Sequence, residues 1–486
     1  MNSSRGEPIG LLLLRGLFFI SVLVSVIPYG SVEPNPFHLA ILLHSVVLIM
    51  CLFVPIKRDA HRRLISSALL LVTVTAAYVL FQTLNLAESD LAHPAWLTAR
   101  DYAGTTEGSI SVNPAATVSA LPALLSPFLV FCCGLILHQS DDSALALWRR
   151  LALLGLSVAI FGIVQHFLFP KFLLLDEKTK YINDVTGTFY NRNTAGTFFG
   201  ITLLLLFGLM IQYWQMIKPY KVVDRLFRLH IFSRDAYGAF FLWILSFFFV
   251  SLTLFLTHSR GGMAATFVAL MSVTLMIVPG LFRNMAAGRR IAAVVAVAGM
   301  VLLLFYAFGG QTLLRMERQG ADDGRWCAFA STLAGIRDNF WTGTGFGTFA
   351  DAFPSYRNEE CGLYGWWNRA HDSYLEAFLG LGAFFVLLFM ATLFRLGLVF
   401  VAGIRERRRF RFVPFLAIGM VLLAALHALV DFSLQIPGFA VFFAAALAAA
   451  ASISLGRGVT RLSPSRSGTP KHADRKNEAR NSPAVQ

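Results

Sequence analysis

The chain is poor in charge, in cysteine and in metal-binding or nucleotide-binding motifs. Only 14% of its 486 residues are Asp, Glu, Lys or Arg, and five are cysteine. It has no HExxH pattern, no paired-cysteine spacing and no acidic pair suited to a divalent ion, so neither a metal site nor another cofactor is expected. A Walker-type phosphate loop is also absent, so the driving force of any reaction must come with the substrate.

Apolar residues dominate instead. They make up 56% of the chain, which includes 45 Phe, and the mean hydropathy is +0.63. These values are typical of a polytopic membrane protein. The net charge of +14 comes mostly from short basic links between apolar runs, which is a topology signal of membrane proteins rather than a sign of nucleic-acid binding.

The apolar runs predict an all-α fold with about twelve transmembrane helices, and no strand pattern is visible. The first run is long enough for a span and lacks a cleavage site, so we read it as a helix rather than a signal peptide. The predicted spans are residues 9–28, 37–56, 64–85, 117–137, 151–168, 194–217, 239–257, 262–282, 291–308, 373–394, 413–432 and 437–455.

The basic residues predict the orientation. Of the 41 Lys and Arg, 28 lie in both termini and the even-numbered links, 12 lie in the odd-numbered links, and Arg15 lies inside the first span. The positive-inside rule therefore places both termini in the cytoplasm. Residues 456–486 are rich in Ser, Pro, Arg and Lys, so we expect a disordered cytoplasmic tail. The expected cytoplasmic links are residues 57–63, 138–150, 218–234, 283–290 and 395–411.

One long water-facing loop, residues 309–372, lies on the opposite face. Apolar residues recur at helical spacing after Asp323, which predicts an amphipathic helix with Arg325 in its first turn, and a second short helix is expected over 349–357. The loop ends at His371. Cys327 and Cys361 both lie in it, whereas the other three cysteines fall in spans, so an extracytoplasmic loop allows these two to form a disulfide.

Arginines gather on this face. Arg192, Arg260, Arg325 and His371 all fall at or near the ends of spans, although the positive-inside rule disfavours arginine there. An anionic ligand would explain them, because the guanidinium group donates two parallel hydrogen bonds to a phosphate. The alternative for any single arginine is a side chain that reaches to lipid headgroups.

Arg260 and His371 are the strongest candidates. Arg260 lies between Ser259 and the pair Gly261 and Gly262, whose missing side chains let a ligand approach the start of a helix. The case for His371 as a catalytic base rests on the arginines and on its titration near neutral pH. Two readings remain open elsewhere: the aromatic residues before His371 either stack on sugar or form an interfacial belt, and His427 with Asp431 is either a structural pair or an orienting one.

Taken together, these motifs resemble the O-antigen ligase and polysaccharide polymerase family of bacterial inner membranes. The resemblance covers about residues 186–438 and rests on ordered segments. They are residues 187–194 (GTFYNRNT), 259–262 (SRGG), 325–326 (RW), 343–349 (GTGFGTF), 354–357 (PSYR) and 370–376 (AHDSYLE), with His427 and Asp431. Family members often have Asn where this chain has Asp372, which leaves the role of that acid open.

The resemblance implies a multi-span, metal-independent, inverting glycosyltransferase acting at the periplasmic face. Its donor would be a glycan on undecaprenyl pyrophosphate, and its acceptor would be lipid A core or a growing glycan. Arg192 and Arg260 carry over as pyrophosphate ligands, and His371 as the base. The remaining expected substrate contacts are Arg325, Ser259, Gly261, Asn191, Asn193, Arg357, Trp367 and Asp431.

The expected organisation is a set of N-terminal transmembrane helices, residues 1–185, then a catalytic membrane domain, residues 186–455, and the tail. Within the family we rank a ligase slightly ahead of a polymerase, and a protein-glycosylating branch last. A lipid-linked glycan transporter is the alternative of another class. It predicts charges along a path near the bilayer midplane, whereas the informative arginines here lie at one face.

Overall fold

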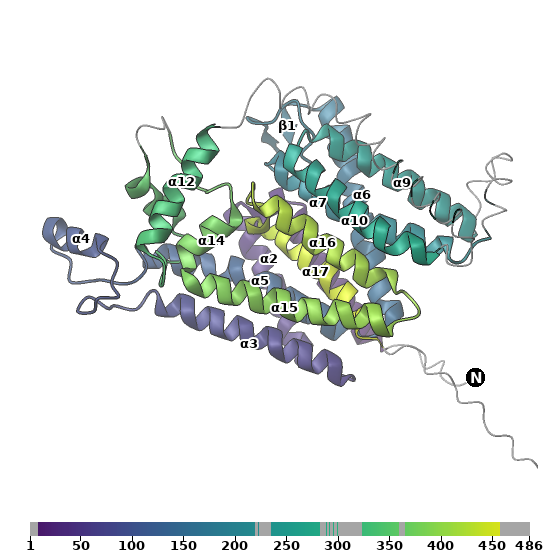
Figure 1. The fold of residues 1–486 in the computed structure, drawn as a ribbon, viewed down its shortest axis with the longest axis horizontal. Coiled ribbons are helices and arrows are strands. Elements are labelled where there is room, and N and C mark those ends of the chain that lie inside the picture. The colour runs from purple at the N-terminus through teal and green to yellow at the C-terminus, as the bar shows by residue number, and fades with distance from the viewer. Residues whose placement is uncertain are drawn as a thin grey trace, which may run out of the picture.

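The computed structural model describes residues 8–218, 235–281, 323–358 and 365–456, and the isolated helical positions 222, 288, 291, 295 and 299. Figure 1 shows that long helices dominate this part of the chain. Its one sheet is a hairpin of two very short antiparallel strands, β1 (Phe172–Leu173) and β2 (Asp176–Glu177), which the sequence pattern does not reveal. The expectation of a fold without strands is wrong only at this hairpin.

Ten helices of the described ranges are long and apolar enough to cross a membrane. A further apolar helix, α16 (Phe412–Ala428), is shorter. The protein is therefore an all-α polytopic membrane protein. The ten helices are α1 (Ile9–Val26), α2 (Pro34–Cys51), α3 (Asp59–Phe81), α5 (Pro114–Leu137), α6 (Asp141–Leu168), α7 (Arg192–Trp214), α9 (Ala236–Leu256), α10 (Arg260–Leu281), α15 (Ala383–Glu406) and α17 (Pro437–Ser454).

The first eight predicted spans each correspond to one of these helices. Their ends differ by up to five residues, as at α2 and α3, and by ten residues at the start of α6. Helix α6 begins at Asp141 instead of residue 151, because Ser140 and Ser143 form a capping box that starts the helix earlier. The tenth predicted span is divided into α14 (Ser373–Leu381) and α15 at Gly382, whose φ of 60° interrupts the helix. Predicted span nine, residues 291–308, lies outside the described residues apart from isolated helical positions.

Two helices form the centre of the bundle. In the stretch of α7 that could cross the membrane, and in that of α17, 89% of the residues are buried, whereas in that of α15 only 17% are buried. Helix α17 is rich in alanine, and small side chains let neighbouring helix backbones approach closely. In a membrane such close packing is a main source of helix association, because lipid provides no hydrophobic driving force between helices. The contact with α5 shows this, since a Cβ added to Gly134 would meet the Ala448 methyl at 2.6 Å.

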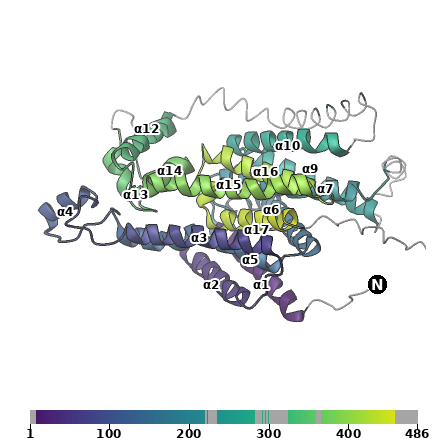
Figure 2. The same cartoon turned by 60° about the horizontal axis from the view of Figure 1, so that its bottom comes forward.

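One end of the bundle carries the short helices, and we call it the α12 end. Both views place α12 (Asp323–Asp338), α13 (Phe349–Ala352) and α4 (Ala95–Ala103) there (Figures 1 and 2). Gln82, which follows α3, ties this end together: its Nε2 donates to the carbonyl oxygens of Thr342 at 2.8 Å and Gly380 at 2.9 Å. Helix α4 shows that residues 82–113 form a second water-facing segment besides the long loop.

The long loop folds as its sequence predicts where it is described. Helix α12 covers the expected amphipathic segment, and α13 with the 3-10 helix η3 (Phe353–Tyr356) covers the second. A small apolar core of its own, which includes Ala328, Phe349 and Phe353, packs these elements against α14. Cys327 is disulfide-bonded, whereas Cys51, Cys132 and Cys133 are free. The remaining cysteine, Cys361, lies outside the described residues.

Candidate functional site

Three helices begin around one buried carboxylate, Asp431, at the α12 end. Asn193, in the first turn of α7, donates from Nδ2 to Asp431 Oδ1 at 3.1 Å. Ser259, which directly precedes α10, donates to Asn193 Oδ1 at 3.1 Å, and Ser373 at the start of α14 donates to the Asp431 carbonyl at 2.8 Å. Because a helix N-terminus carries a partial positive charge, their convergence makes this region favourable for an anion.

The sequence starts each of these helices with a capping side chain. Asn191 Oδ1 accepts from the Asn193 amide at 2.7 Å for α7, and Ser259 Oγ accepts from the Gly262 amide at 3.3 Å for α10. Asp372 Oδ1 accepts from the amides of residues 374 and 375 for α14. These side chains satisfy amides that have no partner within the helix, so they fix where each helix begins.

Glycines let the α7 and α10 ends approach each other. A Cβ on Gly262 would lie 3.2 Å from the Gly196 backbone, and a Cβ on Gly261 would lie 2.8 Å from the His427 ring. Any larger residue at these places would push the helix ends apart. The two glycines of the Ser-Arg-Gly-Gly segment are therefore required for packing.

His427 and Asp431 are connected through two hydroxyl groups. The His427 Nδ1 lies 2.5 Å from Thr197 Oγ1, Thr197 donates to Ser433 Oγ at 3.0 Å, and Ser433 donates to Asp431 Oδ2. His427 is 2% exposed and Asp431 is fully buried. This chain of contacts forms a buried network that holds α7, α16 and the following loop together, so the pair has a structural role.

Arg192 is held by a carboxylate that the sequence patterns do not single out. Its Nη1 lies 2.8 Å from Asp184 Oδ2, and its guanidinium lies over the Tyr181 ring, 5.2 Å from the centroid. The other Asp184 oxygen pairs with His258 Nδ1 at 2.7 Å. Burial alone would raise the pKa of Asp184, but the hydrogen bond from His258 and the charge of Arg192 outweigh it and lower that pKa.

Asp184 and His258 are thus site residues that sequence reasoning missed. A signal was present, because His258 directly precedes Ser259 and Asp184 is the last acid before the segment that begins at Thr186. The pair links the segment before α7 with the segment before α10. Asp184 holds Arg192 with one oxygen and His258 with the other. His258 lies two residues before Arg260, so the pair connects the segments that carry the two arginines.

Arg260 differs from Arg192 in having no counter-ion among the residues that the structure describes. It is the first residue of α10 and is partly exposed, and within the described ranges its guanidinium has no hydrogen bond or ion pair. Arg325, in the first turn of α12, donates from Nη1 to the Val430 carbonyl at 3.3 Å, one residue before Asp431. Two of the predicted arginines therefore border the Asp431 region from different elements.

His371 lies between two aromatic rings. Its ring is 5.7 Å from that of Trp367 and 5.1 Å from that of Phe432, both in edge-to-face orientation. Glu376 fixes the preceding residues, because its oxygens accept from Arg369 Nη1 at 2.9 Å and from the Ala370 amide at 2.8 Å. Since Phe432 directly follows Asp431, this packing brings His371 to the same region as the three helix N-termini.

Both histidines next to this region have unusual backbone conformations. The φ angle is 58° at His371 and 50° at His258. Left-handed conformations are uncommon for residues other than glycine and cluster at functional sites.

Asp372 has a clear structural role as the cap of α14. Burial raises the pKa of this carboxyl group, while the hydrogen bonds from the amides of Leu375 and Tyr374 oppose that rise.

Arg357 lies apart from the Asp431 region. Its Nη2 donates to the Gly365 carbonyl at 2.6 Å, and its guanidinium lies 6.0 Å from the centroid of Phe353. The Phe353 ring is 6.4 Å from that of Trp367, which in turn contacts His371. The structure therefore connects Arg357 to the candidate site through a row of aromatic rings rather than by direct contact.

The fold and this polar region define a class: a multi-pass membrane protein with a cation-bearing site at one end of its helix bundle. Residues 245–390 match the model of the O-antigen ligase family, so this part of the chain is similar to that family. The matched segment includes His258, Arg260, Arg325 and His371. A search of curated proteins found no match.

Proposed function

We propose that the protein is a glycosyltransferase that moves a glycan from undecaprenyl pyrophosphate to an acceptor hydroxyl group. The observation that carries this proposal is the meeting of three helix N-termini at Asp431, with Arg260, which has no ion pair among the described residues, at the start of one of them. Such a site favours a ligand with concentrated negative charge, and a pyrophosphate has it. The match to the O-antigen ligase family supports the same class of reaction.

In the proposed donor complex, Arg260 binds the pyrophosphate through its planar guanidinium, and Arg192 contributes from the adjacent helix. Asp184 holds Arg192 at 2.8 Å, which keeps that side chain oriented before the donor arrives. Ser259, Gly261, Asn191 and Asn193 lie at the same two helix ends and are the remaining proposed contacts of the donor. Fixed positive groups stabilise the charge that builds on the pyrophosphate as it leaves.

His371 accepts the proton of the acceptor hydroxyl group in this proposal. The hydroxyl oxygen attacks the anomeric carbon, the bond from that carbon to the pyrophosphate oxygen breaks, and the electron pair leaves with the pyrophosphate. A single displacement of this kind inverts the anomeric carbon. The edge-to-face contacts with Trp367 and Phe432 hold the imidazole ring, and a positioned base of this type typically accelerates a reaction by about 100-fold to 10,000-fold.

We place this site on the periplasmic face of a bacterial inner membrane, with the catalytic part in residues 186–455 and both termini in the cytoplasm. The excess of basic residues in the opposite links supports this orientation. A transporter is less well supported, because the described arginines of the site lie at helix ends rather than along the middle of the bundle.

Among the acceptors, we favour lipid A core, which makes the protein a ligase rather than a polymerase. The test is the surface glycan of a strain that lacks the gene, with the wild-type gene restored as the control. A ligase predicts lipid A core without attached glycan while polymerised glycan stays on its lipid carrier. Single repeat units attached to lipid A core would instead identify a polymerase, and an unchanged surface glycan would contradict both.

A further inference from the structure

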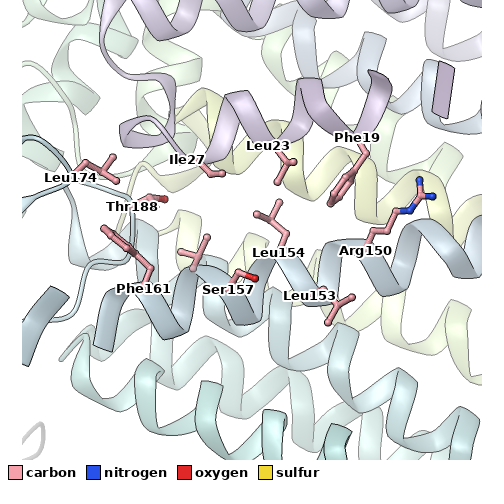
Figure 3. A pocket seen from close by; sticks show the side chains of 11 residues that line it. Phe19, Leu23, Ile27, Arg150, Leu153, Leu154, Ser157, Phe161, Leu174 and Thr188 are labelled. Carbon is pink, nitrogen blue, oxygen red and sulfur yellow. The ribbon is translucent and has the colours of Figure 1, made fainter. Parts of the chain in front are cut away.

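A groove runs between α1 and α6, and Thr188 of the segment before α7 lines the end opposite Arg150 (Figure 3). Its volume is about 480 Å³. Helix α1 lines it with Phe19, Leu23 and Ile27, which recur every fourth residue and so lie on one face (Figure 3). Helix α17 packs against both α1 and α6. The groove therefore lies between α1 and α6, where both helices flank α17.

The α6 wall of the groove is apolar except at one end. Arg150, Leu154, Ser157 and Phe161 recur at helical spacing along it, and Arg150 lies at the end opposite Phe161 (Figure 3). The eleven residue steps from Arg150 to Phe161 correspond to about 16 Å of helix. This length matches half of the ~30 Å hydrocarbon core, which is the share of one leaflet.

Arg150 lies at the depth of lipid phosphate groups. Helix α6 has 28 residues, whereas about 20 suffice to cross the hydrocarbon core. Counting 20 residues back from Leu168, at the candidate-site end, reaches Arg149. Arg150 is thus at the boundary of the opposite leaflet, which is the cytoplasmic one in the orientation proposed above.

The Arg150 side chain is exposed and has no acidic partner among the described residues. Its guanidinium lies 6.0 Å from the centroid of the Phe19 ring, which turns it toward the groove. Of the two acids in the first turn of α6, Asp141 pairs with Arg407. An arginine at a lipid-facing surface needs an anion.

We propose that the groove binds an anionic phospholipid of the leaflet at the Arg150 end. Arg150 binds the phosphate of the headgroup, and one acyl chain lies along Phe19, Leu23 and Leu154. A polyprenyl tail of the donor is a poorer fit, because its pyrophosphate would lie at the candidate site and its hydrocarbon end would meet Arg150. The site is independent of the proposed reaction.

The test uses purified full-length protein equilibrated with equal amounts of phosphatidylglycerol and phosphatidylcholine of identical acyl chains. Native mass spectrometry then counts the lipids retained. We expect wild type to retain phosphatidylglycerol preferentially, and Arg150→Gln to lower that preference about fivefold, the usual effect of one cation near an anionic headgroup. Arg150→Lys should keep most of it. Arg62→Gln, which removes an exposed cation paired with Asp59 at 3.8 Å, is the matched control.

Ser157→Trp fills the groove and should reduce the retention of both lipids. This variant therefore distinguishes binding of the acyl chain from binding of the headgroup. Equal retention of the two lipids by wild type, or an Arg150→Gln protein that behaves like Arg62→Gln, would overturn the proposal. Displacement of phosphatidylglycerol by an equimolar polyprenyl phosphate would assign the groove to the donor instead.

Discussion

Asn193 and Asp431 are 238 residues apart in sequence, yet the Asn193 side-chain amide donates to the Asp431 carboxylate at 3.1 Å. This contact joins the first turn of α7 to the loop that follows α16. Through Ser259 and Ser373 the same pair also holds the beginnings of α10 and α14. The geometry of the candidate site therefore depends on one buried carboxylate that is itself shielded from solvent.

Asp431→Ala should destabilise the protein by about 1–3 kcal/mol, because it leaves the Asn193 amide and the Ser433 hydroxyl group buried without their acceptor. Asp431→Asn should cost less, since it keeps one carbonyl oxygen for Asn193. Thermal unfolding in detergent measures both. Asp101→Ala, on the exposed surface of α4, is the control and should have no effect. A wild-type unfolding temperature for Asp431→Ala would mean that the network is not needed for stability.

Asp184 should make the stability depend on acid pH. Its pKa in the folded protein is lowered from the ordinary value of 3.8. The stabilisation is therefore fully present above that value and is lost as the pH falls through the lowered pKa. Asp184→Asn should be less stable than wild type at neutral pH, and the difference should shrink as the pH falls below about 4. A difference that is independent of pH would show that the ion pairs with Arg192 and His258 contribute nothing.

His371→Ala should leave donor binding nearly intact while the rate of transfer falls about 100-fold to 10,000-fold. The reason is that the proposed base acts on the acceptor and not on the pyrophosphate. Donor affinity and single-turnover transfer are measured in parallel on purified protein in nanodiscs. His38→Ala, which removes an exposed histidine of α2, is the control. Transfer at the wild-type rate would return His371 to a purely structural role.

Most of the helices could be predicted from the sequence, because a span of about 20 apolar residues is a strong signal. The break at Gly382 and the early start of α6 were not predicted, because both depend on backbone conformation and capping rather than on hydropathy. At the site, helix ends with Arg, Gly and Asn were visible in sequence. The Asp184 pair with His258 and the Ser433 hydroxyl bridge were not, since they join residues distant in sequence through single hydrogen bonds.

The orientation predicts which fusions to a periplasm-dependent reporter are active. A reporter placed after Ser355 should be active, and one placed after Arg408 should be inactive, because the basic links lie on the other side. Enzyme activity of each fusion in intact cells is the measurement, and the amount of fusion protein is determined to normalise it. The reverse pattern would place the candidate site on the cytoplasmic side and contradict the proposed orientation.

The central claim is that Arg260 binds an anionic donor through its guanidinium geometry, and donor affinity of Arg260→Lys tests it most directly. Lysine keeps the charge but loses the planar fork, so binding of a polyprenyl pyrophosphate to purified protein should weaken about tenfold or more. Arg337→Lys, an exposed arginine in the last turn of α12, is the matched control and should bind like wild type. If Arg260→Lys also binds the pyrophosphate with wild-type affinity, Arg260 is an arginine of the membrane surface and the proposed donor site is wrong.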